Sequence, residues 1–256
     1  MRIRTFPAAL AAVAAVLLAS IPAHAQTANA AVFGTYYDCD QNRETVADLI
    51  QRNVMGPILD GFVDSGDLIS WGWLSHRVGG DWRRAEYMIA PDRATLMKVR
   101  NQYIEALQAG DDAQLASREL TAICPDHNDY IWAVEASSSP DALAQSREGV
   151  SMSTYYECDV SREGRADEIV DEVLGPIYNQ HVGEGAFTSW SWLSHQTGGK
   201  IRRLFTVGAA DEETLMNHQD ALIAQMQREA PEAVTEFDEI CNSHVDYLWD
   251  VTISSP

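Results

Sequence analysis

The sequence has 256 residues, a formal charge of -20 at pH 7 and 46% hydrophobic residues. Such an acidic chain repels phosphate backbones and anionic lipid heads, which argues against nucleic acid or a membrane surface as a partner. Its length fits two small domains or one large one.

The N-terminus has the pattern of an export signal. Arg2 and Arg4 precede an apolar run over residues 8–21, and Ala23-His24-Ala25 places small residues where a signal peptidase reads. We predict a Sec-type signal peptide over residues 1–25, cleaved after Ala25, and a periplasmic or secreted mature protein. An uncleaved N-terminal anchor is the alternative.

The rest of the chain is a tandem duplication. Residues 70–84 return as residues 189–203, with the Trp-x-Trp-Leu-Ser-His, Gly-Gly and Arg-Arg groups in register. Between residues 36–108 and 155–227, 32 of 73 positions are identical without a gap. We therefore predict two repeats, residues 26–136 and 154–256, joined by a Ser-rich linker over residues 137–153.

Each repeat is expected to begin with a strand and a helix. In the first, residues 32–38 form the strand, with Phe33, Thr35 and Tyr37 on one face. Asp40 is expected to cap the helix, and Gly56-Pro57 to kink or split it. Apolar residues recur every fourth position along this helix: Val46, Ile50, Val54, Ile58 and Phe62.

A β-hairpin follows, turning at Gly79-Gly80. A two-residue turn places Trp73 opposite Glu86. One face of the hairpin then carries Trp71, Trp73, Glu86 and Met88, or Trp190, Trp192, Phe205 and Val207 in the second repeat. We expect this face to pack on the helices. The opposite face carries Ser70, Leu74, His76 and Arg83, or Ser189, Leu193, His195 and Arg202.

A second helix is expected after Asp92 and Asp211, which can cap it. It breaks at Gly110 in the first repeat and before Pro231 in the second. A short third helix then leads to the last strand. Alternate residues of that strand share a face: Tyr130, Trp132 and Val134, and Tyr247, Trp249 and Val251.

The predicted order is strand, helix, strand, strand, helix, strand, the ferredoxin-like βαββαβ plan. Two such sheets can cover each other, and this chain supplies both. The fold class is therefore α+β, and the mature chain resembles the dimeric α/β-barrel superfamily, fused into a pseudo-dimer that we expect to be monomeric. The resemblance implies a shape and a pocket region. Superfamily members include cofactor-free monooxygenases, isomerases and haem-binding proteins, so it implies no single chemistry.

Four cysteines, two per repeat, in a chain with an export signal indicate disulfides. In the βαββαβ plan the first and last strands are antiparallel neighbours, so the plan implies the pairs Cys39–Cys124 and Cys158–Cys241. A metal site or redox pair is the alternative, but no Cys-x-x-Cys is present.

Glu86 is the candidate catalytic residue. The expected register points it into an apolar face where the second repeat has Phe205. A carboxyl group held there would have a raised pKa and could act as a general acid or base. A register shifted by one residue would leave Glu86 in solvent.

Candidate ligand-binding residues lie in both hairpins. Each histidine faces an arginine that could hold an anion, although a structural role for the histidine is the alternative. The tryptophans could stack a flat ligand or form core. These candidates are His76, Arg83, His195, Arg202, Trp71, Trp73, Trp190 and Trp192.

His127 with Asp129, and His244 with Asp246, share a strand face, which allows a carboxylate-oriented histidine. We place the two histidines of one repeat at opposite ends of its sheet, and we expect no metal and no cofactor. Haem would need an axial histidine on a helix or on a pocket wall, and the helical candidates are His181 and His218.

The sequence therefore favours a small-ligand-binding or non-catalytic exported protein, with pockets between each sheet and its kinked first helix. A cofactor-independent monooxygenase or isomerase with a Trp-lined pocket is the alternative, and haem binding is weaker. An enclosed pocket containing Glu86 would favour an enzyme.

Overall fold

A computed structural model describes residues 29–143 and 148–255. Its strands form one closed antiparallel barrel in the order β1-β3-β2-β8-β5-β7-β6-β4. The eight strands of these described ranges are β1 (Ala31–Asp38), β2 (Ser70–Gly79), β3 (Arg84–Ala90), β4 (Asp126–Ser137), β5 (Val150–Glu157), β6 (Ser189–Thr197), β7 (Arg203–Ala209) and β8 (Ser243–Ser254).

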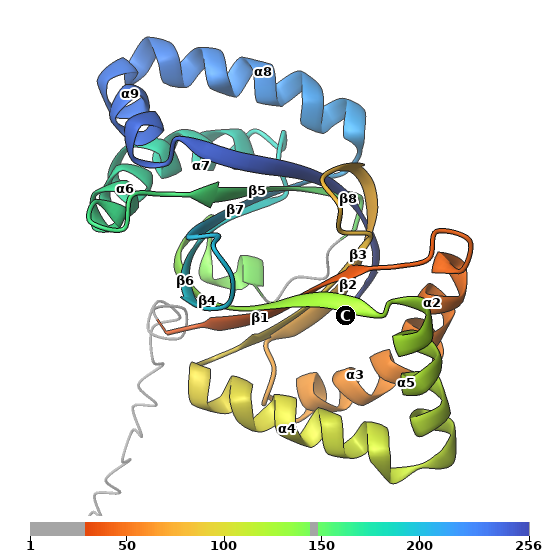
Figure 1. Cartoon of the computed structure of the whole chain (residues 1–256). Coiled ribbons are helices and arrows are strands. Elements are labelled where there is room, and N and C mark those ends of the chain that lie inside the picture. The colour runs from red at the N-terminus through yellow and green to blue at the C-terminus, as the bar shows by residue number, and fades with distance from the viewer. Residues whose placement is uncertain (1–28, 144–147, 256) are drawn as a thin grey trace, which may run out of the picture.

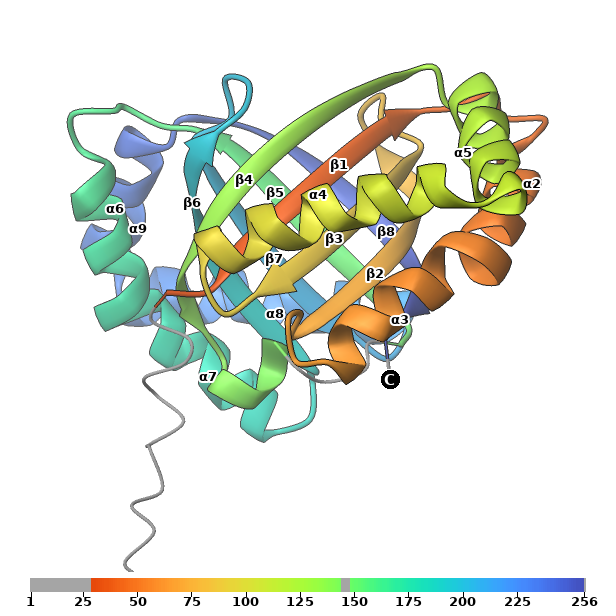
Figure 2. The same cartoon turned by 90° about the horizontal axis from the view of Figure 1, so that it is seen from below.

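Helices cover the barrel on two opposite sides (Figure 1). In Figure 2, α4 lies across the outer surface of the first repeat's strands. The first repeat contributes α2 (Glu44–Ile50), the π-helical turn η1 (Gln51–Met55), α3 (Gly56–Asp64), α4 (Arg93–Ala109) and α5 (Asp111–Ile123). The second contributes α6 (Glu163–Ile169), η3 (Val170–Leu174), α7 (Gly175–Gly183), α8 (Glu212–Glu229) and α9 (Pro231–Ile240).

The two repeats share the barrel through their edge strands. Strand β2 pairs with β8 and β4 pairs with β6, so each four-stranded sheet completes the other. The inner surface is filled by aromatic side chains, including the stacked pairs Tyr130–Trp132 and Tyr247–Trp249. The predicted α+β class and fused pseudo-dimeric barrel are confirmed.

The predicted hairpin register is also confirmed. Trp73 pairs with Glu86 and Leu74 with Ala85. Trp71 and Trp73 face the helices of their own repeat and are buried in its core. Leu74 points the other way, into the barrel. Alternation of side chains along the strand thus separates a core inside the barrel from two cores under the helices.

The first helix differs from its predicted form. Asp40 does not cap it: its carboxylate accepts from the Asn42 backbone and α2 begins four residues later. The residues turned fully inward lie one position after the predicted apolar stripe, and Val46 is 40% exposed. The helix is interrupted by a π-helical turn before Pro57 and by another before Pro176 in the second repeat. Each turn accommodates the backbone N–H that the proline lacks. The inward residues are Ala47, Gln51, Met55 and Leu59.

The remaining helices and the last strands match the prediction. Asp92 accepts a hydrogen bond from the Thr95 backbone N–H at 2.8 Å, and Asp211 caps α8 in the same way.

The linker is shorter than expected, because the residues from Val150 onward pair with β7 and form β5.

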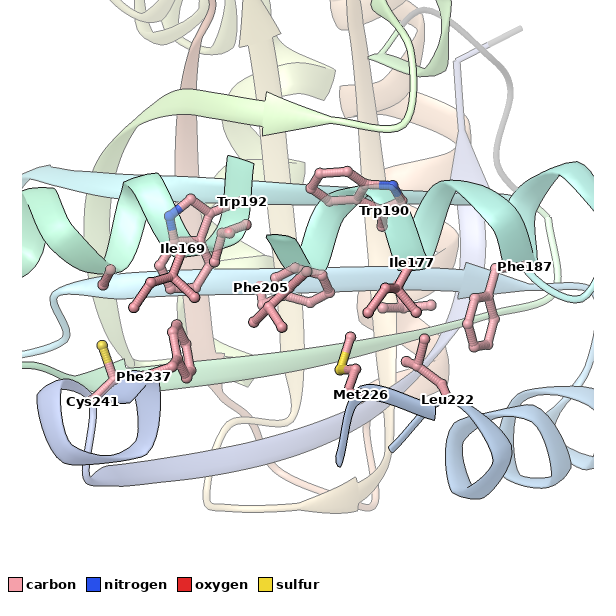
Figure 3. Close-up of a cluster of buried hydrophobic side chains, with 14 of the residues drawn as sticks. Ile169, Ile177, Phe187, Trp190, Trp192, Phe205, Leu222, Met226, Phe237 and Cys241 are labelled. Carbon is pink, nitrogen blue, oxygen red and sulfur yellow. The ribbon is translucent and has the colours of Figure 1, made fainter. Parts of the chain in front are cut away.

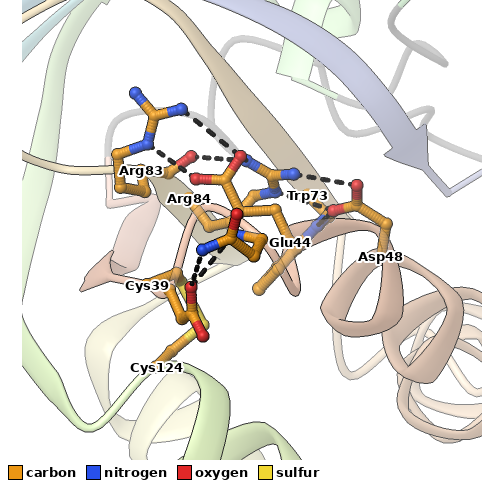
Figure 4. The surroundings of a disulfide bond; sticks show 9 residues. Cys39, Glu44, Asp48, Trp73, Arg83, Arg84 and Cys124 are labelled. Carbon is orange, nitrogen blue, oxygen red and sulfur yellow. Dashed lines mark hydrogen bonds and ion pairs between the residues drawn. A yellow bond between two sulfur atoms is a disulfide. The ribbon is translucent and has the colours of Figure 1, made fainter.

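Both predicted disulfides are present, Cys39–Cys124 and Cys158–Cys241. Each joins the end of the first strand of its repeat to the start of the last, as Figure 4 shows for the first. Two disulfides are typical of a protein that lies outside the cytoplasm. In the described ranges, no helix has the length and apolar character required to cross a membrane.

Candidate functional site

Each repeat has a pocket between the outer face of its sheet and its helices. In the first repeat the pocket has a volume of about 290 Å³ and is lined by β1, β3, β4, α4 and α5. The predicted position under the kinked first helix needs correction for this repeat, because that helix contributes only Met55 to the lining. Helices α4 and α5 form the roof instead, and Glu86 lies in the wall of the pocket. In the second repeat the prediction agrees with the structure, since Val170, Leu174 and Tyr178 of the corresponding helix line the pocket.

Glu86 is 4% exposed and is held by two side chains. The Gln51 amide Nε2 donates to Glu86 Oε2 at 2.8 Å, and the Tyr103 hydroxyl lies 3.5 Å from the same oxygen. Gln51 is fully buried, and its Oε1 has no hydrogen-bond partner among the described residues. Glu86, Gln51 and Tyr103 therefore form a small polar cluster inside the hydrophobic core of the first repeat.

Burial raises the pKa of Glu86 from 4.5 to about 7, because the charged carboxylate loses its hydration. The hydrogen bonds from Gln51 and Tyr103 oppose this increase, and the nearby Asp129 adds to it. At neutral pH the group is divided between its acid and its carboxylate, which is the condition for efficient proton transfer in either direction.

A second polar group lies nearer the mouth of the same pocket. Asp129 Oδ1 accepts from the Thr35 hydroxyl at 2.9 Å, and the Arg100 guanidinium lies 3.6 Å from Asp129 Oδ2. The guanidinium also lies 4.7 Å above the Phe33 ring centroid. Arg100 is therefore ion-paired with Asp129, although no described residue accepts a hydrogen bond from its guanidinium within normal distance.

The second repeat has the corresponding pocket, with a volume of about 300 Å³. Its sheet contributes Thr154, Tyr156, His244 and Asp246 at the positions of Thr35, Tyr37, His127 and Asp129. The central polar group is absent. Val170, Phe205, Gln219 and Leu222 replace Gln51, Glu86, Arg100 and Tyr103.

The arginines of the His–Arg pairs expected to bind an anion are already paired with carboxylates of the protein, as Figure 4 shows for Arg83 and Glu44. Arg83 Nη1 lies 2.7 Å from His76 Nδ1, and the Arg83 guanidinium binds both carboxylate oxygens of Glu44. Arg202 binds His195 and Glu163 in the same manner. Burial, followed by the Arg202 charge, lowers the pKa of His195. These clusters fasten the hairpin end to the first helix.

The four hairpin tryptophans line neither pocket. Trp73 and Trp192 are fully buried, and their indole N–H groups donate to Asp48 and Asp167. Trp71 and Trp190 are at most 2% exposed and donate to Asp60 and Asn179. Their geometry is that of core residues with satisfied polar atoms.

His76 and His127 lie at the same end of the sheet, which corrects the predicted opposite ends. His127 pairs with Tyr37 at the end of β1, and the neighbouring β3 and β2 bring His76 to that end. Their rings are on opposite faces, since His76 contacts Tyr247 inside the barrel and His127 contacts Tyr37 outside. The described ranges contain no group of three or more side chains suited to a metal ion.

The pocket residues do not fit haem. His127 and His244 are half exposed at the pocket mouths, with Nε2 at 3.8 and 3.5 Å from Asp129 and Asp246. The helical candidates His181 and His218 line neither pocket, and His181 Nε2 lies 3.0 Å from Gln225 Oε1.

Similar folds occur in solved structures. A candidate monooxygenase from Lactobacillus acidophilus NCFM matches with a TM-score of 0.60 at 9% identity, over 89% of this chain and 96% of the other. A candidate monooxygenase from Fusobacterium nucleatum gives 0.60 at 10% identity over 89% and 94%. An anthrone oxidase-like protein gives 0.56 at 11% identity over 90% and 94%. No protein-family model and no curated protein sequence matches the chain. The chain thus has the dimeric α/β-barrel fold, with both halves in one polypeptide.

Reading the sequence singled out Glu86 but missed its partners. Gln51 lies one residue outside the predicted apolar stripe, and Tyr103 and Arg100 lie on a helix without an obvious motif. A signal was present nevertheless, because all three differ in kind from Val170, Leu222 and Gln219 in the second repeat.

Proposed function

We propose that this protein is an extracytoplasmic enzyme that removes a proton from a small, partly aromatic substrate without a cofactor, and that Glu86 is the general base. The observation that carries the proposal is a buried carboxyl group in the wall of a 290 Å³ pocket, with its pKa raised to about 7. Pockets of this size accept small molecules.

The chemistry proposed begins with Glu86 as a carboxylate. It takes a proton from a C–H or O–H group of the substrate, and the electron pair stays on the substrate as an enolate or phenolate. Arg100, which lines the same pocket and is paired with Asp129, would stabilise that negative charge. Protonated Glu86 can return the proton to a different carbon, which completes an isomerisation.

Oxidation of the same anion is the related possibility. Dioxygen would then accept electrons from the substrate anion and would be the co-substrate. The fold neighbours described as monooxygenases and as anthrone oxidase-like are the reason to include it. Both outcomes share the proton removal by Glu86, so one experiment tests the common step.

A ring-opening probe tests that step. In 5-nitrobenzisoxazole, a base removes the C3 proton, the N–O bond breaks, and a coloured phenolate forms. We expect the rate with the protein to rise with pH through about 7 and Glu86→Gln to lower it about 100-fold, as for loss of a general base. Glu105→Gln removes an exposed carboxylate from α4 and should leave the rate unchanged.

Equal rates for the parent protein and Glu86→Gln would contradict a catalytic base. Non-catalytic ligand binding is the alternative, and the two hydrogen bonds to Glu86 also suit a fixed polar anchor for a ligand. Binding of the probe without turnover would favour that alternative.

Export remains part of the proposal. The two disulfides support a location outside the cytoplasm. The signal peptide and its cleavage after Ala25 lie outside the described residues, and N-terminal sequencing of the exported protein tests them. We expect Gln26 as the first residue, whereas an intact Met1 would contradict cleavage.

A further inference from the structure

The pocket of the second repeat stays open although its centre has become apolar. Phe205, Leu222 and Val170 stand where the first repeat has Glu86, Tyr103 and Gln51, yet the volume is about 300 Å³ rather than 290 Å³. An empty apolar cavity lowers stability in proportion to its size. Substitutions that served only to build a core would be expected to fill this space.

The substitutions also make the walls aromatic. Four lining positions that are aliphatic or acidic in the first repeat carry rings in the second. Figure 3 shows three of these rings, Phe187, Phe205 and Phe237. The Tyr178 and Phe205 ring centroids are 4.5 Å apart. Rings around an open space favour a flat ligand, which can stack or meet them edge to face. The four changes are Leu59 to Tyr178, Leu68 to Phe187, Glu86 to Phe205 and Leu120 to Phe237.

Tyr178 brings one hydrogen-bond donor into this lining. Its counterpart Leu59 is completely buried in the first repeat, whereas the Tyr178 side chain borders the cavity. No described residue forms a hydrogen bond with the Tyr178 hydroxyl. Tyr178 is only partly buried and lines the pocket, so its hydroxyl can donate to an acceptor atom that a ligand supplies.

The mouth of the pocket selects against negative charge. Asp238, Asp246 and His244 lie there, the last half exposed. Among the described residues, no lysine or arginine lines the pocket, and Gln219 takes the place of Arg100. A carboxylate or phosphate ligand would meet two carboxylates and no fixed cation.

We propose that the pocket of the second repeat binds an uncharged, flat aromatic molecule with a carbonyl or ether oxygen, and that this oxygen accepts a hydrogen bond from Tyr178. The site uses none of the residues assigned to proton transfer in the first repeat. Its success or failure is therefore independent of the proposed function.

Two bicyclic probes of similar size test the site by calorimetric titration of the full mature chain. The neutral ketone 2-acetylnaphthalene should bind at one saturable site, and the anion 2-naphthoate should not bind. Tyr178→Phe should weaken binding of the ketone about five- to tenfold, the effect of one neutral hydrogen bond. Met226→Trp places a large side chain in the pocket and should abolish binding.

Met216→Trp is the matched control, because it makes the same change at a 39% exposed position of α8 that does not line the pocket. It should leave binding unchanged. The proposal is overturned if the ketone does not bind, if 2-naphthoate binds as tightly, or if Met226→Trp binds normally. Equal affinities for the parent protein and Tyr178→Phe would overturn the role of the hydroxyl.

Discussion

Gln51 Nε2 and Glu86 Oε2 are 2.8 Å apart, and both side chains are buried. Gln51 projects from a π-helical turn and Glu86 from a central strand of the first repeat. The equivalent positions of the second repeat hold Val170 and Phe205. The barrel therefore folds with or without this polar pair, and the pair serves something other than closing the barrel.

Stability should depend on the charge of Glu86. Its pKa is about 7 in the folded protein and 4.5 without burial. The contribution of Glu86 to the free energy of unfolding is therefore fully present below pH 4.5 and is lost as the pH rises through 7. Glu86→Gln should therefore stabilise the protein at pH 8, by up to roughly 3 kcal/mol, and much less at pH 5. Urea unfolding at both pH values measures this, with exposed Glu105→Gln as the control. A difference between parent and variant that does not change with pH would contradict the burial argument.

Removal of the Gln51 donor should raise the pKa of Glu86 further, because that hydrogen bond favours the carboxylate. Gln51→Val should destabilise the protein at pH 8 by about 1–3 kcal/mol and move the midpoint of the pH profile upward. Adding Glu86→Phe and Tyr103→Leu copies the second repeat and should restore stability. A triple variant less stable than Gln51→Val alone would show that the polar group cannot be exchanged as a unit.

The Asp48 carboxylate should be important for folding. It accepts hydrogen bonds from Arg84 at 2.7 and 2.9 Å and from the Trp73 indole at 2.7 Å, and Arg84 is 4% exposed. Asp48→Asn leaves a buried guanidinium partly unpaired and should cost about 3 kcal/mol in urea unfolding. Asp67→Asn, which breaks the exposed pair with Lys98, should cost less than about 1 kcal/mol. Equal costs would mean that Arg84 is better solvated than its burial indicates.

The two disulfides should contribute almost equally, because they close chain segments of 85 and 83 residues. Replacing either pair by alanine should cost roughly 2–5 kcal/mol, measured by thermal unfolding under oxidising conditions. Dithiothreitol should reduce the difference between the parent protein and each variant. A non-reducing peptide map joining Cys39 to Cys158 or Cys241 would contradict the strand order as well as the pairing.

The fold was largely accessible from the sequence. Because the chain is duplicated, each helix and strand could be predicted from two related sequences. Gly79-Gly80 indicated the hairpin register that brings Trp73 opposite Glu86. The first helix was less accessible. Its buried row contains the small Ala47 and the polar Gln51, so the more hydrophobic row one residue earlier was predicted in its place.

The site was predicted only in part. Residue type and spacing indicated Glu86, but the distances that connect it to Gln51 and Tyr103 arise from helix packing, which the chain order does not specify. The His–Arg pairs were candidates for binding an anion because the sequence does not show their carboxylate partners. Glu44 and Glu163, which bind the two guanidinium groups, lie 39 residues away from the arginines in sequence.

A barrel assembled from two identical chains must carry the same pocket twice, because one gene encodes both. Here the strand pairs β2–β8 and β4–β6 unite the halves within a single polypeptide. A mutation that places a carboxyl group in one half leaves the other half untouched, so selection can act on each cavity separately. Dilution cannot separate the two halves either, because they belong to one covalent chain.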